Sequence, residues 1–135
     1  MHVYPEWSAV SEPADPDCFT GQVWRTEHLP RVGSDGLIGH RFLYAPGARS
    51  NWHVHEGDQA LVVVGGRGLA HWTGIDPARV LLPGDWVHVD PGVEHWHGAA
   101  ADEVFVHLAV TASGGTHWLG PVSEADYQRA QAAFG

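Results

Sequence analysis

The clearest pattern of hydrophobic and polar positions lies between residues 37 and 44, which read LIGHRFLY. Ile38, His40, Phe42 and Tyr44 would share one face of an extended strand, because successive side chains of a strand point to opposite sides. Similar short segments recur along the chain, separated by turns rich in glycine and proline. Short strands at this spacing are typical of an antiparallel sandwich or barrel, so we expect an all-β fold.

The length of 135 residues suits one domain with one core, so we expect a single domain over residues 1–135. Residues 1–17 hold three prolines and predict an irregular N-terminal arm, and residues 30–36 predict a loop. The barrel core is expected over residues 37–111. Besides the strand at 37–44, strands are expected at residues 19–29, around 53–55, and at 60–64, 67–73, 79–82, 86–89, 94–98 and 103–111.

A helical pattern is expected only near the end of the chain. Ser123 is a predicted N-cap, and Glu124 and Asp126 place acidic side chains in the first turn, where the helix dipole favours them. We therefore expect a short C-terminal helix over residues 123–134. Ala130 and Phe134 would lie on the same side as Tyr127, which would pack this helix against the barrel.

Composition narrows the possible functions. The chain has 16 acidic residues against 7 basic ones, all of them arginine, for a net charge of −9. That balance argues against a nucleic-acid partner, which needs a basic face. Cys18 is the only cysteine, so neither an intrachain disulfide nor a Cys-x-x-Cys pair is expected. No leader opens the chain and no apolar run nears the roughly 18 residues of a membrane span. We expect a cytoplasmic protein with no membrane partner.

Eleven histidines are the unusual feature, and two of them stand in the segment 47–66, GARSNWHVHEGDQALVVVGG. His53 and His55 are separated by one residue, so on a strand both imidazoles leave the same face. Gln59 follows after the turn-forming residues 56–58. A hairpin of this kind brings two imidazoles and one amide oxygen to a single point. Nitrogen and oxygen ligands that converge in this way suit a borderline divalent metal.

A second segment with histidines, residues 84–97, reads GDWVHVDPGVEHWH. After the tight turn at residues 90–92, His95 and His97 share one face of the next expected strand. One histidine from this segment would complete a set of four protein ligands. Four ligands leave an octahedral metal with two open positions, and open positions are typical of catalytic rather than structural sites.

The two segments together resemble the two conserved motifs of the cupin family. The first motif is matched by Gly47, His53, His55, Gln59 and Gly66, with glutamine where most cupins carry glutamate. The second is matched by Gly84, Asp85, Pro91, Gly92 and His95, although the proline stands directly beside the glycine. The resemblance implies a double-stranded β-helix (jelly-roll) barrel, usually a homodimer. It also implies a metal site with the ligands His53, His55, Gln59 and His95.

The segments PGARSNWHVHEGDQ, PGVEHWHGAA and VHLAV resemble one group of small single-domain cupins more closely. This group includes the bacterial manganese-dependent hydroxynitrile lyases and cupins associated with carboxymuconolactone decarboxylases. The resemblance implies one divalent transition metal per chain, namely Mn, Fe, Ni, Zn or Co, with Mn or Fe favoured. Because Gln59 is neutral, three imidazoles and an amide would leave the metal its full double charge, which makes it a stronger Lewis acid.

Strand parity, with the resemblance placing His107 inside and near the metal, selects candidates for the wall of the cavity around the metal. The expected substrate-binding residues are Phe42, Tyr44, Asn51, Phe105 and Ala109. Arg49 and Arg67 are expected at an exposed rim that could receive an acidic substrate.

Three further histidines are candidates for moving a proton. His107 is the first candidate for a general acid or base, with His40 and His97 behind it. The resemblance implies a histidine at the position of His107 in the lyase group and a small residue at the position of His40. For each of the three, a hydrogen-bonded role in the core is an equal alternative.

Three functions stay open at this point. In a lyase, the metal would polarise a carbonyl or cyanohydrin oxygen while His107 moves the proton. In a dioxygenase, Fe(II) or a similar metal would bind a small substrate and dioxygen side by side. A non-enzymatic cupin would only bind a small molecule, and as a sensor it would need a linked DNA-binding region. The chain has no such region, which favours an enzyme.

Overall fold

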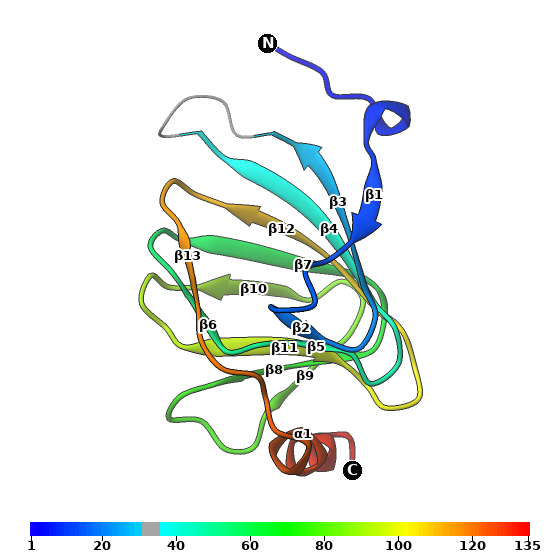
Figure 1. Cartoon of the computed structure of the whole chain (residues 1–135), viewed down its shortest axis with the longest axis vertical. Coiled ribbons are helices and arrows are strands. Elements are labelled where there is room, and N and C mark those ends of the chain that lie inside the picture. Colours follow the sequence, from blue (N-terminus) through cyan, green and yellow to red (C-terminus); the bar gives the residue numbers. More distant parts are fainter. Residues whose placement is uncertain (31–35) are drawn as a thin grey trace.

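Two antiparallel sheets face each other and form a barrel, with one helix packed on the outside (Figure 1). The computed structural model describes residues 1–30 and 36–135, so most of the loop expected at 30–36 lies outside the described residues. The strands are β1 (Ser11–Pro13), β2 (Phe19–Thr20), β3 (Val23–Leu29), β4 (Ile38–Tyr44), β5 (Arg49–Ser50), β6 (His53–His55), β7 (Gln59–Gly66), β8 (Gly68–Trp72), β9 (Arg79–Leu81), β10 (Trp86–Val89), β11 (His95–Ala99), β12 (Phe105–Thr111) and β13 (Thr116–Trp118).

The first sheet has the strand order β1-β3-β4-β12-β7-β10, and the second has the order β13-β6-β11-β5-β2. In the second sheet, β8 also pairs with β11, and β9 pairs with β8. Strand β11 therefore lies between β8 on one side and β5 and β6 on the other. The expected all-β jelly-roll barrel is confirmed, and this arrangement places β6 and β11 side by side.

Buried and exposed side chains alternate along the strands, and the buried ones pack between the two sheets. Leu61 and Val63 of β7 point inward and are almost fully buried, whereas Val64 is exposed. They belong to the inner face, where a core cluster includes Tyr44, Ala70 and Phe105. Burial of this apolar surface is the main stabilising contribution to a barrel of this kind.

The N-terminal part of the chain differs from the expectation in two ways. The strand expected at residues 19–29 is divided at Gly21, whose φ of 80° belongs to the left-handed region that favours glycine. As a result β2 joins the second sheet and β3 the first. The arm over residues 1–17 holds a 3₁₀ turn, η1 (Glu6–Ser8), and the edge strand β1, which pairs with β3.

The expected C-terminal helix is present as α1 (Glu124–Gln131), followed by the 3₁₀ turn η2 (Ala132–Phe134). The Ser123 side chain caps it by accepting a hydrogen bond from the backbone N–H of Asp126 at 3.1 Å. Tyr127 packs with the fully buried Trp96 of β11 and donates a hydrogen bond to the carbonyl of Ala99 at 2.8 Å. Both faces of β11 are therefore covered, one by the barrel interior and the other by the helix.

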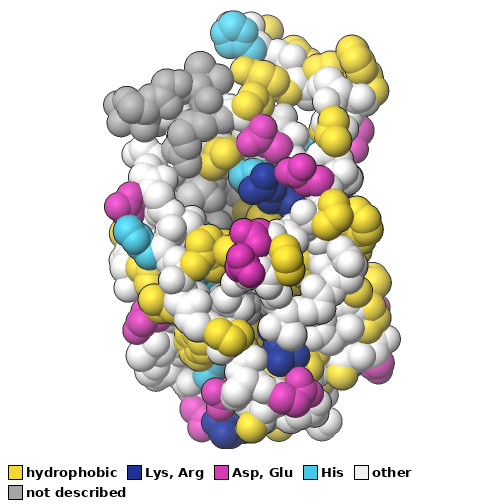
Figure 2. Space-filling model, viewed as in Figure 1, with side chains coloured by type: hydrophobic (Ala, Val, Ile, Leu, Met, Phe, Trp, Pro, Cys, Tyr) yellow, Lys and Arg dark blue, Asp and Glu magenta, His cyan; other side chains and the backbone are white. Residues whose placement is uncertain are grey.

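The described part of the chain contains no helix with the length and apolar character that crossing a membrane requires. On the face shown in Figure 2, the basic side chains among the coloured residues lie apart from one another rather than in a patch.

A substitution at Gly68 tests how closely the two sheets pack against each other. A Cβ at this position would collide with the ring of Phe105, which is fully buried and has no room to shift. Gly68→Ala should therefore lower the free energy of unfolding by about 1–3 kcal/mol, as overpacking of a core does. Urea unfolding followed by circular dichroism measures this change. Gly120→Ala is the control, because a Cβ there meets nothing within 4 Å. Equal stability of the two variants would contradict this packing.

Candidate metal centre

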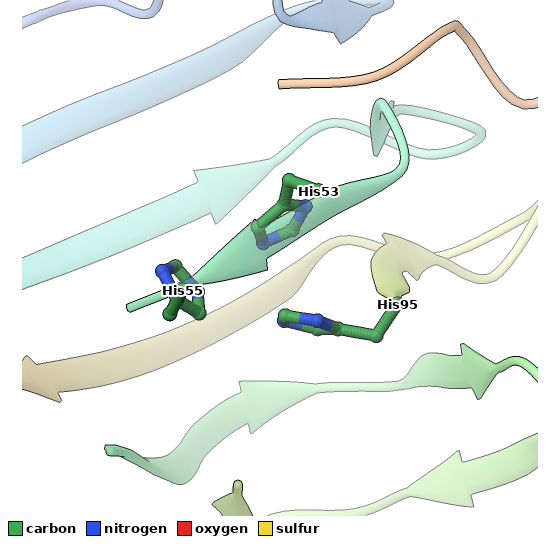
Figure 3. A group of neighbouring side chains, drawn as sticks. All are labelled: His53, His55 and His95. Atoms are coloured by element: carbon green, nitrogen blue, oxygen red, sulfur yellow. The ribbon is translucent and has the colours of Figure 1, made fainter. Parts of the chain in front are cut away.

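Three buried histidines from two adjacent strands point toward one another (Figure 3). His53 and His55 leave the same face of β6, and His95 opens β11 in register with His53. One ring nitrogen from each of the three lies within 4.8 Å of the others. The period of two in the His-Val-His segment and the pairing of β6 with β11 produce this group, which could hold a metal ion.

Backbone carbonyls orient two of these rings. Nδ1 of His53 lies 2.9 Å from the carbonyl oxygen of Asn51, and Nδ1 of His95 lies 2.9 Å from that of Val93. A carbonyl oxygen only accepts, so each Nδ1 carries the proton and each Nε2 keeps a lone pair. Metal-binding histidines are usually held in this way by a partner on the other ring nitrogen.

His55 is oriented from a different element. Its Nδ1 lies 3.1 Å from the hydroxyl of Thr116 in β13. Nε2 of His55 and Nε2 of His95 are both buried, with no hydrogen-bond partner among the described residues. A buried acceptor without a partner costs about 1–3 kcal/mol, which a bound cation would offset.

Gln59 adds an oxygen to the group. Its amide nitrogen donates a hydrogen bond to the hydroxyl of Thr111 at 3.0 Å, which fixes the orientation of the amide. Its Oε1 is buried and has no hydrogen-bond partner within residues 1–30 and 36–135. His53, His55, His95 and Gln59 are thus the residues that could hold a divalent cation, and the pattern of oriented and unpaired atoms fits such an ion.

Strand β13 was not expected from the sequence, and it covers this group. It pairs with β6, so that Thr116 lies opposite His55 and Trp118 opposite His53. The Trp118 ring lies against the ring of His53, with 4.8 Å between their centroids. The only signal in the sequence is three residues with Thr116 and Trp118 on one face, between Gly114-Gly115 and Gly120, which is too short for a periodic pattern.

Burial keeps the imidazoles of the barrel interior uncharged. It lowers the pKa of His55 and of His107 to about 4, and it lowers the pKa of His53 and His97 well below the usual value. The pKa of His95 is also lowered, by burial in the first place. All five rings are therefore neutral at pH 7, which is the state in which an imidazole binds a metal.

A cavity of about 240 Å³, which we call the main cavity, adjoins this group. His53, His55 and Gln59 line one side of it. Of the other residues expected at the site, His40, Phe42, Tyr44, His97, His107 and Ala109 line it. Lining residues that the sequence analysis missed include Phe19, Ser50, Thr111, Thr116 and Trp118.

Two expected substrate-binding residues lie outside the lining of the main cavity. Asn51 falls between β5 and β6, where strand parity no longer applies, and its amide donates hydrogen bonds to the carbonyls of Asp17 (2.9 Å) and Leu119 (3.5 Å). Phe105 does point inward, but it lies in the core and not in the wall of the main cavity. It is fully buried in the core against the rings of Tyr44 and His107.

The two arginines expected at an exposed rim also have other roles. Arg49 is buried on the outer side of the second sheet, where it binds the carbonyl of Val122 and the carboxylate of Glu124 and lies 4.4 Å over the ring of Tyr127. Arg67 pairs with Asp102 and Glu103. Neither side chain lines the main cavity, so the expectation that Arg49 and Arg67 form its rim was wrong, and among the described arginines it is Arg25 that lines it.

The imidazole of His107 packs among aromatic rings. Its ring stacks on Phe42 and on Tyr44, with 5.5 Å between centroids in each case. Nδ1 lies 3.3 Å from the carbonyl oxygen of Leu108, so Nδ1 donates and Nε2 keeps its lone pair. The Tyr44 hydroxyl lies 3.3 Å from that Nε2, and burial raises the pKa of Tyr44, so its hydroxyl stays protonated. The pair can therefore accept and pass on a proton.

Comparison with known proteins places the chain in a family. The Cupin_2 family model, described as a cupin domain, matches residues 40–111, and the chain belongs to the cupin family. It is 35% identical over 133 residues to an (R)-mandelonitrile lyase of Granulicella tundricola, across 96% of this chain and 100% of that relative. The fold and family expected from the two motifs are thereby confirmed.

Solved structures agree with this placement. A cupin-like protein from Thermotoga maritima is 39% identical, with a TM-score of 0.84 over 87% of this chain and 91% of that one. A predicted oxalate decarboxylase from the same organism has a TM-score of 0.71 at 20% identity, over 83% of this chain and 99% of that one. The latter likeness shows the fold alone.

The lowered histidine pKa values predict how the stability of the metal-free protein depends on pH. Between the usual pKa of about 6.5 and the folded-state values, the unfolded chain binds more protons than the folded one. The stability is therefore fully present above about pH 6.5 and is lost as the pH falls. The loss should reach about 1.4 kcal/mol per pH unit for each histidine that gains a proton only on unfolding.

Urea unfolding of protein treated with a chelator, repeated between about pH 8 and pH 5, measures this slope. His107→Phe is the control, because it should reduce the slope by about one proton. A stability that stays constant down to pH 5 would show that these rings are accessible to water and not buried as described.

Proposed function

We propose that this chain is a metal-dependent lyase that cleaves a small cyanohydrin into a carbonyl compound and hydrogen cyanide. One Mn(II) or Fe(II) ion would be held by His53, His55, His95 and Gln59. The observation that carries the proposal is the set of buried, unpaired ligand atoms, Nε2 of His55 and His95 and Oε1 of Gln59, beside the main cavity. The full-length similarity to a relative named (R)-mandelonitrile lyase supports this reaction class over oxygenation.

The size and lining of the main cavity favour a small, partly aromatic substrate. Its volume of about 240 Å³ lies below the roughly 300–1,000 Å³ of pockets for drug-sized ligands. Phe19, Phe42 and Trp118 give it flat apolar walls. A ring could rest against these side chains while the hydroxyl and nitrile groups turn toward the histidines.

The bound ion would supply Lewis-acid polarisation of the substrate oxygen. The side chains would manage the proton. The Tyr44 hydroxyl, 3.3 Å from Nε2 of His107, would take the hydroxyl proton of the cyanohydrin while its own proton moves to that nitrogen. The bond to the nitrile carbon then breaks with its electron pair on cyanide, and the carbonyl forms. The proton on His107 then passes to cyanide, so that hydrogen cyanide leaves and the ring is neutral again.

The positions of the other candidate residues indicate what each would do in the proposed reaction. The hydroxyl of Tyr44 donates toward His107 and steadies the acceptor nitrogen. His40, whose Nε2 lies 3.7 Å from a carboxylate oxygen of Glu27, is a second titratable group in the lining, on the strand next to that of His107. Phe42 and Ala109 shape the substrate pocket. A homodimer would cover Trp24, Leu43 and Trp86, which are exposed on the first sheet.

The ligand set predicts the metal content of the protein. Elemental analysis of protein purified without added metal should find about one equivalent of transition metal per chain. His53→Ala and His95→Ala should each remove the metal, because each variant lacks one imidazole ligand and keeps only three protein ligands. His117→Gln is the control, since that ring is exposed and bound to Glu56. Full metal content in His95→Ala would contradict the site.

The reaction class is tested by turnover of mandelonitrile with and without dioxygen. A lyase releases benzaldehyde and cyanide at the same rate under nitrogen, whereas a dioxygenase consumes dioxygen and stops without it. His107→Phe keeps the stacked shape but removes the acceptor nitrogen, and we expect kcat to fall roughly 100- to 10,000-fold while the metal is retained. Unchanged kcat in that folded, metal-loaded variant would assign the proton transfer elsewhere.

A further inference from the structure

A second cavity lies on the other side of the histidines, where the two sheets part. Strand β10 is the last strand of the first sheet, and it faces β8 and β11 of the second sheet across this gap (Figure 1). The space measures about 190 Å³. We call it the seam cavity; it is lined by Ala70, Trp72, Val87, His88, Val89, Asp90, Val93, His95 and His97. It shares only His97 with the lining of the main cavity.

The walls of the seam cavity are mostly apolar. Ala70 and Trp72 of β8 face Val87 and Val89 of β10, and Val93 adds to them from the turn before β11. An apolar cavity of similar size, about 150 Å³, is large enough to hold a benzene molecule. The side chain of Trp72 offers one flat wall, against which a planar ligand can stack.

Two of the residues that line this cavity, His95 and His97, carry a buried Nε2 without a hydrogen-bond partner among the described residues. His97 is 4% exposed, and its Nε2 is buried without a hydrogen bond to any described residue. His97 is not part of the group of three histidines whose ring nitrogens converge. A buried, unpaired imidazole nitrogen is unfavourable by itself, so a ligand hydroxyl that reached it would gain a hydrogen bond at little desolvation cost.

Charge limits the class of ligand. No lysine or arginine lines the seam cavity, and the carboxylate of Asp90 stands at its exposed edge. The exposed imidazole of His88, also in the lining, already pairs with the carboxylates of Asp58 at 2.8 Å and Asp90 at 3.7 Å. An anionic ligand therefore finds no counter-charge, and a neutral one fits better.

We propose that the seam cavity is a second binding site, for a small neutral molecule with a flat apolar body and one hydroxyl group. The body would lie between Trp72 and the valines of β10, and the hydroxyl would pair with His97. This inference does not rest on the proposed reaction, since it uses only the walls of the folded chain, one of which is formed by the proposed metal ligand His95.

Phenol is the probe, and metal-free protein is used so that the probe cannot bind to an ion. Titration calorimetry of the full chain should show saturable phenol binding with a dissociation constant in the millimolar range, as expected for a ligand of this size. Val87→Phe fills the seam cavity from its edge and should remove one phenol site per chain. Ala109→Leu narrows the main cavity, where a ring could also bind, and should keep the site that Val87→Phe removes.

The role of His97 is tested separately, by comparing phenol with toluene. Wild-type protein should prefer phenol, and His97→Leu should bind the two equally, because only the hydroxyl pairs with the ring. If Val87→Phe does not fold, Ala70→Val replaces it, with the unfolding midpoint as the check. Loss of phenol binding in Ala109→Leu but not in Val87→Phe would overturn the proposal, and so would the absence of saturable binding to wild-type protein.

Discussion

Five neutral imidazoles are buried in the middle of this barrel, and the rest of the site depends on keeping them neutral and correctly turned. The carbonyls of Asn51 and Val93 accept hydrogen bonds from the Nδ1–H groups of His53 and His95, while the hydroxyl of Thr116 orients His55. These contacts leave the Nε2 lone pairs of His53 and His95 without a proton, in a buried group whose ligand atoms lie within 4.8 Å of one another. An arrangement of this kind is unfavourable unless something positive satisfies it, which is the physical reason to expect a cation there.

Gln59 determines the net charge of the proposed ligand set. A glutamate would cancel part of the metal's charge, whereas an amide held by Thr111 contributes an oxygen and no charge. The low-dielectric surroundings strengthen the field of an uncompensated double charge on a nearby substrate oxygen. His107 is not one of the three converging rings and stacks on Phe42 and Tyr44, so in the proposed reaction the Lewis acid and the proton acceptor would be separate groups. That separation is what heterolytic cleavage of a cyanohydrin requires.

The sequence predicted the strands with strong alternation or clear Gly/Pro boundaries, and it predicted the inward histidines from parity. It failed where tertiary contacts override the local pattern. Asn51 has the parity of His53, but the chain leaves the sheet between β5 and β6, so parity does not carry across. Arg49 looked like an exposed charge, yet α1 covers it. Strand β13 is defined by pairing with β6 alone, and a three-residue strand gives no periodicity to detect.

The central claim is that a single divalent ion is held by three imidazoles and one neutral amide. X-ray absorption spectroscopy of the purified, metal-loaded protein measures the ligand types around the metal directly. The proposed ligand set predicts outer-shell scattering from three imidazoles and a first shell of nitrogen and oxygen only. Gln59→Glu should keep the imidazole signal while shifting the absorption edge. A spectrum with fewer than three imidazoles, or one that Gln59→Glu leaves unchanged, would contradict it.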